Sequence, residues 1–333
     1  MTPLPRISLI TPSFQQARYL EECIASVHDQ KYPNIEHIVV DGGSTDGSKA
    51  IIEKHADKFA WWCSKKDKGQ SDAINKGLRH ATGEVFGWLN SDDALLPGSL
   101  ARVAHAFAAD PELLVFGGRV VHRDAKGAHA FNALNDVHER ERLFIEPVIN
   151  QPATFYRTTA VRIIGGVDPR LRYVMDVELW WQLIFWNGID HLRFDPVDLA
   201  AFRLHDESKT STAILGFLDE IASLLHGLCV QSGNDDLADV LKVGHKPKRG
   251  LRGIPVNVTH GALVRAMTLH FLLKWNADIH RENQWRMMKA LAGADRGTLT
   301  TEQQQRWRRI EDQLRIGSWK LFRAKRKLMH LLK

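Results

Sequence analysis

Small, hydroxylated and acidic residues follow directly after four short hydrophobic segments in the first 95 residues. The first segment leads into Thr11-Pro12-Ser13-Phe14, and the second ends at Asp41 before the glycine-rich residues 42–48. The third precedes residues 66–72, and the fourth precedes Asn90-Ser91-Asp92-Asp93. The preferences of these residue types for turns and helix caps explain each group by itself. They explain less well why such a group follows all four segments. We therefore expect the four groups to form one binding site.

The last of these groups could bind a metal ion. Asp92 and Asp93 are adjacent carboxylates, which repel each other unless a cation or a basic group lies between them. Mg²⁺ or Mn²⁺, held by one or two carboxylates and by phosphate oxygens of a substrate, would satisfy both. An Asp-rich turn ahead of Pro97 is the structural alternative.

Residues 41–48 resemble a phosphate-binding loop only in their glycine content. The segment lacks the lysine of a P-loop and the glycine spacing of dinucleotide-binding folds. Asp46 is expected to be the N-cap of the following helix. Asp41 closes a strand, where a carboxylate can accept hydrogen bonds from a base or a ribose, so we predict a nucleotide contact there.

In the segments before and between these groups, hydrophobic residues follow two patterns in turn, one typical of β-strands and one typical of α-helices. Short β-branched runs alternate with stretches of helical spacing, which favours an α/β fold with a mostly parallel sheet and helices on both faces. Ligands of such sheets bind beyond the carboxyl ends of the strands. Strands are predicted at residues 7–11, 36–41, 59–63, 84–89 and 113–117.

The alternation ends near residue 118. Residues 119–131 predict a hairpin with its turn at Lys126-Gly127, residues 151–156 a strand, and residues 175–187 a helix ended by Gly188. Beyond about residue 206 the pattern predicts helices alone. These are expected at residues 215–241, 263–275 and 304–332.

Composition is that of a globular protein. Of 333 residues, 44% are hydrophobic and 25% are charged. Three widely spaced cysteines fit neither a disulfide framework nor a thiolate zinc site, which favours a reducing compartment. The first residues lack a secretion signal, and the longest apolar candidate, residues 262–275, is interrupted by charged side chains. We expect a cytoplasmic protein.

The basic charge is concentrated at the C-terminus. The net charge is +6, but residues 300–333 carry ten Lys and Arg against three acidic residues, which leaves −1 for residues 1–299. A near-neutral main part without a recognised module argues against nucleic-acid binding. Apolar residues of the tail form one helical stripe, and basic residues face away from it. Such a helix could contact an anionic membrane surface, or pack on its own domain with a solvated basic face. The stripe comprises Ile310, Leu314, Leu321, Leu328 and Leu332.

Taken in order, these motifs resemble family 2 glycosyltransferases with the GT-A fold, which is Rossmann-like. The motifs are Thr-Pro-Ser-Phe, Val-Asp-Gly-Gly-Ser-Thr-Asp-Gly-Ser, Asp-Lys-Gly-Gln-Ser-Asp-Ala-Ile-Asn-Lys-Gly, Ala-Thr-Gly-Glu and Leu-Asn-Ser-Asp-Asp. The resemblance covers about residues 6–210 and is greatest to bacterial enzymes that build O-antigen, capsule or exopolysaccharide.

The resemblance implies an organisation and an activity. Residues 1–210 would form the GT-A domain, with a nucleotide-sugar-binding half at 1–117 and an acceptor half at 118–210. Residues 211–333 would be a helical extension. The reaction would be an inverting, metal-dependent transfer of one sugar from a nucleoside-diphosphate donor, usually UDP-linked. The acceptor would be a saccharide hydroxyl, expected to be lipid-linked, in surface polysaccharide synthesis.

The resemblance also implies roles for single residues on the donor side. Thr11, Pro12 and Ser13 would line the nucleotide pocket, Asp41 would contact the base, and Asp67 would lie in a loop near the donor. Residues 90–93 match the Asp-x-Asp region that holds the ribose and the diphosphate-bound metal, with Asn90, Ser91 and Asp92 on the nucleotide and Asp92 and Asp93 on the metal. Asn90 stands where many members have the first aspartate, which leaves metal affinity and liganding register open.

Inverting transfer requires a general base that accepts the proton of the acceptor hydroxyl. Residues 173–182 resemble the family's Glu-Asp-x-x-Leu-Trp pattern, with Met175 in place of the glutamate and Asp176 retained. On a helix, Asp176 shares with Trp180 the face expected to turn into the protein, whereas Glu178 is rotated by about 200°. A helix start would keep Asp176 ionised. We predict Asp176 as the base, with helix capping as the alternative.

The remaining assignments concern the acceptor and the diphosphate. Gln151, Glu178 and Trp180 would lie on the acceptor side, and His205 would ligate the metal or contact the diphosphate, unless it is a loop histidine satisfied by the backbone. The Gln-x-x-Arg-Trp motif of processive synthases is absent near Trp180. Single-sugar addition is therefore expected. A catalytically inactive nucleotide-sugar-binding relative is the alternative, against which the retained aspartates argue.

Overall fold

The computed structural model describes residues 3–124, 126–131, 133–206, 213–276, 279–297 and 299–331. The chain divides into two compact units, one formed by residues 1–143 and 147–214 and the other by residues 144–146 and 215–333. The predicted boundary between residues 210 and 211 lies outside the described residues and stays a prediction.

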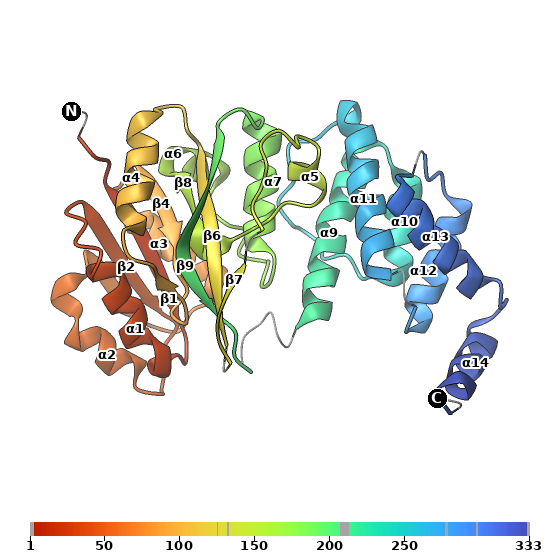
Figure 1. The fold of residues 1–333 in the computed structure, drawn as a ribbon, viewed down its shortest axis with the longest axis horizontal. Helices are drawn as coiled ribbons and strands as arrows, with labels where there is room; N and C mark the ends of the chain where they lie inside the picture. The colour runs from red at the N-terminus through yellow and green to blue at the C-terminus, as the bar shows by residue number, and fades with distance from the viewer. Residues whose placement is uncertain are drawn as a thin grey trace. The chain divides into compact units, whose positions relative to one another are not determined.

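The first unit contains a sheet whose one half is entirely parallel (Figure 1). Strands β1 (Ile7–Ser13), β2 (Ile35–Asp41), β3 (Trp61–Ser64) and β4 (Val85–Trp88) lie in the order β3-β2-β1-β4. A helix connects each strand to the next, so the carboxyl ends of the four parallel strands lie at the same edge of the sheet. The connecting helices are α1 (Ala17–His28), α2 (Ser48–Lys54) and α3 (Gln70–His80), with a short 3₁₀ turn η1 at Ala56–Lys58.

The other half of the sheet is mixed. Strand β8 (Thr154–Arg157) runs antiparallel to β4 and to β6 (Val115–Asp124). Strand β9 (Leu192–Arg203), which the sequence pattern did not predict, runs parallel to β6 and carries β5 (Ala94–Leu95) at its far side. Strand β7 (Gly127–Phe131) pairs antiparallel with β6, and Asp124 faces Gly127. The predicted hairpin and the α/β fold class are therefore confirmed.

The remaining elements of this unit follow the predicted pattern in part. Helix α7 has the predicted bounds, Met175–Asn187. The strand predicted at residues 151–156 begins only at Thr154, because Gln151–Ala153 form the 3₁₀ turn η2. The other helices of the unit are α4 (Ser99–Ala109) and α6 (Thr158–Ile164), and the short helix α5 (Arg142–Ile145) has two residues in each unit.

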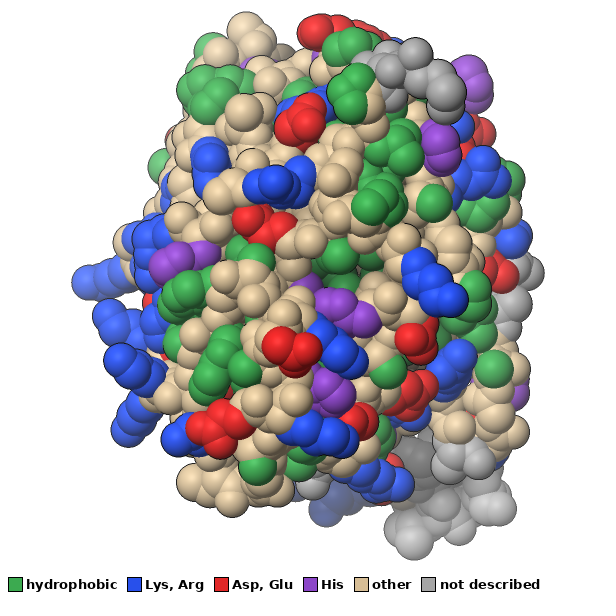
Figure 2. All heavy atoms as spheres, turned by 90° about the vertical axis from the view of Figure 1, so that its left-hand side faces the viewer, with side chains coloured by type: hydrophobic (Ala, Val, Ile, Leu, Met, Phe, Trp, Pro, Cys, Tyr) green, Lys and Arg blue, Asp and Glu red, His purple; other side chains and the backbone are tan. Residues whose placement is uncertain are grey.

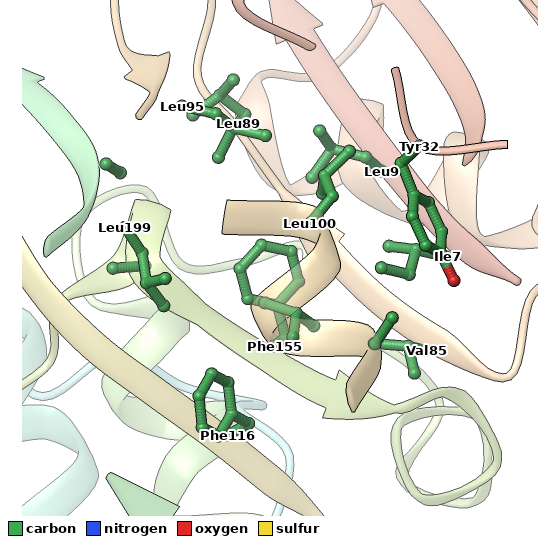
Figure 3. Packing of buried hydrophobic residues seen from close by; sticks show 14 of the residues in the cluster. Ile7, Leu9, Tyr32, Val85, Leu89, Leu95, Leu100, Phe116, Phe155 and Leu199 are labelled. Carbon is green, nitrogen blue, oxygen red and sulfur yellow. The ribbon is translucent and has the colours of Figure 1, made fainter. Parts of the chain in front are cut away.

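Both faces of the sheet are covered by helices. Ile7, Leu9 and Val85 on one face pack in a single buried cluster with side chains of α1 and α4 and with Phe116, Phe155 and Leu199 from the mixed half (Figure 3). On the other face α3 approaches so closely that a Cβ on Gly77 would lie 2.7 Å from Ile10. Continuous burial of Ile7 and Leu9 on one side and Ile10 on the other explains why these strands lack polar alternation.

The second unit is helical throughout its described residues (Figure 1). The helix predicted at residues 215–241 is two helices, because Gly233 adopts φ +77°, and the helix predicted at 304–332 is broken where Gly317 adopts φ +82°. Leu332 and the side chain of Leu328 lie outside the described residues. The helices are α9 (Ile214–Ser232), α10 (Asp235–Gly244), α11 (Gly261–Asn276), α12 (Glu282–Gly293), α13 (Thr301–Leu314) and α14 (Trp319–Leu331), with a 3₁₀ turn η3 at Val258–His260.

Among the described residues, α9 alone has the length and apolar composition of a membrane-spanning helix. Residues 262–275, the longest apolar stretch expected from the sequence, lie in α11 and do not meet these criteria. A buried core helix meets the same criteria, and about half of α9 is buried, so α9 is weak evidence for a span.

The first prediction concerns the core. Phe155 is 1% exposed and packs beneath Gly87, where a Cβ would lie 2.8 Å from its ring. Phe155→Ala should lower the free energy of unfolding by about 3–5 kcal/mol, because it leaves a cavity that the sheet cannot close. Urea unfolding measures this change. Ile163→Ala, at a position 70% exposed, is the control and should change it by less than about 0.5 kcal/mol. Equal effects would contradict this description of the core.

Candidate functional site

The carboxyl ends of the four parallel strands are neighbours, as predicted. Ser13 at the end of β1 pairs with Asp41 at the end of β2, and Asp41 pairs with Ser64 at the end of β3. On the other side of β1, the backbone N–H of Leu89 donates to Ile10, so Asn90 follows immediately at the same edge. The polar groups found in the sequence therefore come together at one place.

Asp41 is fully buried and holds the loop that follows it. One carboxylate oxygen, Oδ2, accepts hydrogen bonds from the backbone N–H of Gly43 (3.1 Å), from that of Ser44 (2.9 Å) and from the hydroxyl of Ser64 (2.6 Å). The other, Oδ1, accepts from the hydroxyl of Ser44. Because a carboxylate offers about four acceptor positions, Oδ1 retains capacity for a further donor.

Two side chains, those of Phe14 and Asp67, converge on Gly42. A Cβ on this glycine would lie 3.1 Å from the ring of Phe14 and 3.2 Å from both carboxylate oxygens of Asp67. Asp67 is held by the backbone N–H of Gly69, which donates to its Oδ1 at 2.8 Å. Phe14 is 60% exposed although it follows a buried strand. The sequence motif included Phe14 but gave it no role; an aromatic residue directly after a strand of this sheet was the available signal.

The prediction that Asp46 is the N-cap of α2 is wrong. Gly47 occupies the N-cap position of α2. Asp46 instead accepts hydrogen bonds from Ser48 at the start of α2 (3.0 Å) and, with its other oxygen, from the N–H of Ala17 at the start of α1 (2.8 Å). Its carboxylate therefore joins the beginnings of two helices.

The side chain of Thr11 turns into the protein. Thr11 is fully buried, its hydroxyl lies 2.9 Å from Nε2 of His37, and Nδ1 of His37 lies 3.1 Å from His28. Burial, with a smaller contribution from His28, lowers the pKa of His37 from 6.5 to about 3. Pro12 and Ser13 are also buried, and among the described residues the Ser13 hydroxyl has no hydrogen-bond partner.

A chain of side-chain amides surrounds the end of β4. Nε2 of Gln151 donates to the backbone carbonyl of Trp88 at 2.7 Å, and Oε1 of Gln151 accepts from Nδ2 of Asn90 at 3.0 Å. Oδ1 of Asn90 accepts from Nε2 of Gln70, the first residue of α3, at 2.6 Å. The chain links β4, η2 and the start of α3. Ser91, the next residue, is buried.

Asp92 and His205 lie side by side. Oδ2 of Asp92 is 3.1 Å from Nε2 of His205, and their side chains are 21% and 12% exposed. A carboxylate oxygen and an imidazole nitrogen suit a divalent ion such as Mn²⁺. Among the described residues no group of three His, Cys, Asp or Glu side chains is placed to hold a metal. The pair therefore fits a metal whose other ligands come from a substrate.

Asp93 was predicted as a metal ligand, and the structure argues against this. Asp93 is 2% exposed, its Oδ1 accepts the N–H of Arg203 at 3.0 Å, and its Oδ2 faces Asn90 at 3.4 Å. Burial, together with the charge of Asp92, raises the pKa of Asp93 well above its usual value. A buried carboxyl whose two oxygens face Arg203 and Asn90 is oriented towards the protein and serves as a structural group.

Two of the predicted acceptor-side residues are core residues. Glu178 is fully buried and accepts a hydrogen bond from Nε2 of Gln182 at 2.8 Å, so the expectation that it faces away from the protein is wrong. Trp180 is 1% exposed, and its Nε1 donates to the carbonyl of Leu143. Helix α7 is buried around most of its circumference, which a one-face helical argument does not anticipate.

Asp176 remains partly exposed in the first turn of α7. Its Oδ1 accepts the N–H of Val177 at 2.9 Å. Burial and the charge of Asp176 raise the pKa of Tyr156, whose ring stacks on Trp88 at 6.0 Å. Trp88 also carries the carbonyl that binds Gln151, so both the ring of Tyr156 and the amide chain contact Trp88.

The molecular face that includes the first strands is of mixed charge. Figure 2 shows basic, acidic and histidine side chains interspersed across its centre. Residues 1–214 carry 24 Lys and Arg against 28 Asp and Glu. This face does not form the continuous basic track that nucleic-acid binding favours.

Comparison with known proteins agrees with this geometry. Residues 8–160 match the family described as Glycosyl transferase family 2. This matched segment is therefore similar to family 2 glycosyltransferases and spans somewhat less than half of the chain. An uncharacterized glycosyltransferase of Rickettsia typhi is 28% identical over 231 residues, which cover 67% of this chain and 71% of the relative. One from Mycobacterium tuberculosis is 35% identical over 175 residues, 50% of this chain and somewhat less than two thirds (64%) of the relative.

Solved structures share the fold of this chain. TarS residues 1–349 from S. aureus, in complex with UDP-GlcNAc, match 94% of this chain and 93% of theirs, with a TM-score of 0.56 at 16% identity. A mannosyltransferase from Pyrobaculum calidifontis, in complex with GDP-Man and Mn²⁺, matches 97% of this chain and 83% of its own, with a TM-score of 0.53 at 17% identity. At these identities the likeness establishes the fold, and the predicted GT-A fold is confirmed.

The second prediction concerns His37, which stays neutral in the folded protein well below the pH at which an unfolded histidine is protonated. Since its folded pKa is lowered, it contributes stability above pH 6.5 that is lost as the pH falls towards 3, at about 1.4 kcal/mol per pH unit. His37→Gln should remove most of this slope in urea unfolding between pH 7 and pH 4. His138→Gln, at an exposed position, should keep the slope of the parent protein. A His37→Gln curve parallel to that of the parent would contradict the burial of a neutral imidazole.

Proposed function

We propose that this domain transfers one sugar from a UDP-sugar to a hydroxyl of a saccharide acceptor, with inversion at the anomeric carbon. The observation that carries this proposal is the convergence of four strand ends on one edge, with Asp41, Asp67 and Asp92 brought there from separate segments. A family 2 domain in which these groups meet has a nucleotide-sugar donor as its expected ligand.

The donor nucleotide would lie against Gly42. The exposed ring of Phe14 offers a face on which a base can stack. Oδ1 of Asp41 can accept one further hydrogen bond, and uracil carries a ring N–H donor. The UDP-GlcNAc bound to TarS supports UDP, whereas the GDP-Man of the Pyrobaculum enzyme makes a guanine donor the natural comparison in a binding screen.

Asp92 and His205 would hold Mg²⁺ or Mn²⁺. Such an ion supplies positive charge that offsets the negative charge developing on the departing diphosphate. The Mn²⁺ of the Pyrobaculum enzyme supports this assignment. With one protein carboxylate and one imidazole, most of the coordination would come from the diphosphate, so metal and donor should bind cooperatively.

Asp176 would act as the general base. It lies in the first turn of a 13-residue helix, where the helix dipole favours the ionised carboxylate. An ionised carboxylate can accept the proton of the acceptor hydroxyl as that oxygen attacks the anomeric carbon. Gln151, at the end of β4, would lie on the acceptor side, and the burial of Glu178 and Trp180 removes them from that role.

The third prediction tests the base. Asp176→Asn preserves the size of the side chain and the helix that carries it, but removes the basic carboxylate. The rate of sugar transfer should therefore fall by at least about a hundredfold. UDP binding, measured by calorimetry in Mn²⁺, should stay within about twofold of the parent protein. Asp168→Asn, at a buried residue that pairs with Arg170, is a control for effects on folding.

Two results would decide against this proposal. Unchanged transfer by Asp176→Asn would exclude Asp176 as the base. A parent protein that binds UDP with Mn²⁺ but turns over no nucleotide sugar would favour the alternative, a catalytically inactive nucleotide-sugar-binding protein.

We further propose that the acceptor is lipid-linked, that the product enters bacterial surface polysaccharide, and that the protein works at the cytoplasmic face of the membrane. Residues 215–333 carry 21 Lys and Arg against 11 Asp and Glu, a net charge of +10. Helix α14 buries Phe322 but leaves Leu321 62% exposed among exposed basic residues. A basic surface with an exposed apolar residue suits peripheral contact with anionic lipid.

The fourth prediction tests this contact by charge reversal. Four Lys→Glu or Arg→Glu changes in α14 should abolish most co-sedimentation with phosphatidylglycerol vesicles at low salt, because each basic residue contributes about 1 kcal/mol near the surface. The changed residues are Lys320, Arg323, Lys325 and Lys327.

The matched control reverses four exposed lysines of the first unit and should leave vesicle binding within about twofold. These are Lys31, Lys49, Lys58 and Lys126. Equal loss in both variants, or no loss in the α14 variant, would contradict a role for α14.

A further inference from the structure

The amide chain at the end of β4 has a direction that its contacts determine. The carbonyl of Trp88 can only accept a hydrogen bond, so Gln151 must present Nε2 to it, at 2.7 Å. Oε1 of Gln151 then requires a donor, which is Nδ2 of Asn90 at 3.0 Å. The oxygen of Asn90 consequently faces Nε2 of Gln70, at 2.6 Å. A backbone carbonyl thus fixes the orientation of every amide in the chain.

This direction explains the residue type at position 90. The Asn90 amide nitrogen also faces Oδ2 of Asp93 at 3.4 Å, so its two hydrogens point towards two acceptors. An aspartate there would place a carboxylate oxygen against Oε1 of Gln151 and against the buried Asp93. A carboxylate at position 90 would leave Oε1 of Gln151 and Oδ2 of Asp93 without the donor that Nδ2 of Asn90 supplies, which is unfavourable for partly buried groups.

We propose that Asn90 is a positioning residue that couples the donor loop to the acceptor side, and that it does not ligate a metal. Through Gln70 it fixes the first turn of α3, directly after the loop that carries Asp67. Through Gln151 it fixes η2 against β4. The inference rests on the proposed donor site and assigns to Asn90 a role that a charged residue at this position could not fill.

The fifth prediction follows from the separation of this chain from the Asp92–His205 pair. Asn90→Ala should weaken binding of UDP, measured by calorimetry, about tenfold, and by the same factor in Mn²⁺ and in EDTA. Gln151→Ala, which removes no candidate metal ligand, should give the same metal-independent loss. The double variant should be at most about twofold weaker than either single variant, because both changes break one chain.

Two control variants bracket this result. Asp92→Asn should weaken UDP binding in Mn²⁺ and leave it nearly unchanged in EDTA. Asn34→Ala removes an amide that donates to Leu4 beside the start of β2, at the opposite ends of the strands, and should leave UDP binding unchanged in both buffers.

Distinct outcomes would overturn the inference. A loss in Asn90→Ala that appears only in Mn²⁺ would make Asn90 a metal ligand, and additive effects of Asn90→Ala and Gln151→Ala would show that the two residues act separately. If the parent protein binds no UDP, the proposed donor fails instead. The same double-variant cycle measured by urea unfolding then decides the inference, and additive changes in unfolding midpoint would overturn it.

Discussion

Parallel pairing of β1 with β2 on one side and β4 on the other is the constraint on which the site depends. Since these strands run in the same direction, each chain segment leaving them starts at the same edge, whatever its distance in sequence. Residues from segments as far apart as 14, 42 and 67 come into contact there, and a slip in any register would separate them. The core holds β1 in this position, because Ile7 and Leu9 are buried on one face of the strand and Ile10 on the other.

The acidic residues of the site divide into two kinds. Asp41 and Asp93 are buried and accept hydrogen bonds from backbone N–H groups of the loop after β2 and of Arg203. Asp92 and Asp176 stay partly exposed. Burial of a carboxylate is tolerated only where donors compensate it, so the buried pair is held by the protein, although Oδ1 of Asp41 can accept one further hydrogen bond. The two adjacent aspartates, Asp92 and Asp93, therefore differ in their surroundings: Asp92 is partly exposed and Asp93 is buried.

Local signals in the sequence were sufficient for the parallel strands, the hairpin at β6 and β7, and the bounds of α7. Strand β9 was missed because Pro196 and four charged residues obscure its pattern, and its pairing with β6 is a long-range contact. The direction of Glu178 was missed because α7 is surrounded by protein, so that one helical face does not define inside and outside. The hydrogen bonds of Asn90 depend on three segments that only the fold brings together, and no spacing in the sequence encodes them.

The central claim is that a nucleoside diphosphate and a divalent ion bind at the shared edge of β1, β2, β3 and β4. Anomalous diffraction from crystals grown with UDP and Mn²⁺ tests it most directly. The account predicts an Mn²⁺ peak in contact with Oδ2 of Asp92 and Nε2 of His205, with the uracil against Gly42 and Phe14. A peak at any other group of side chains, or UDP bound away from this edge, would contradict it.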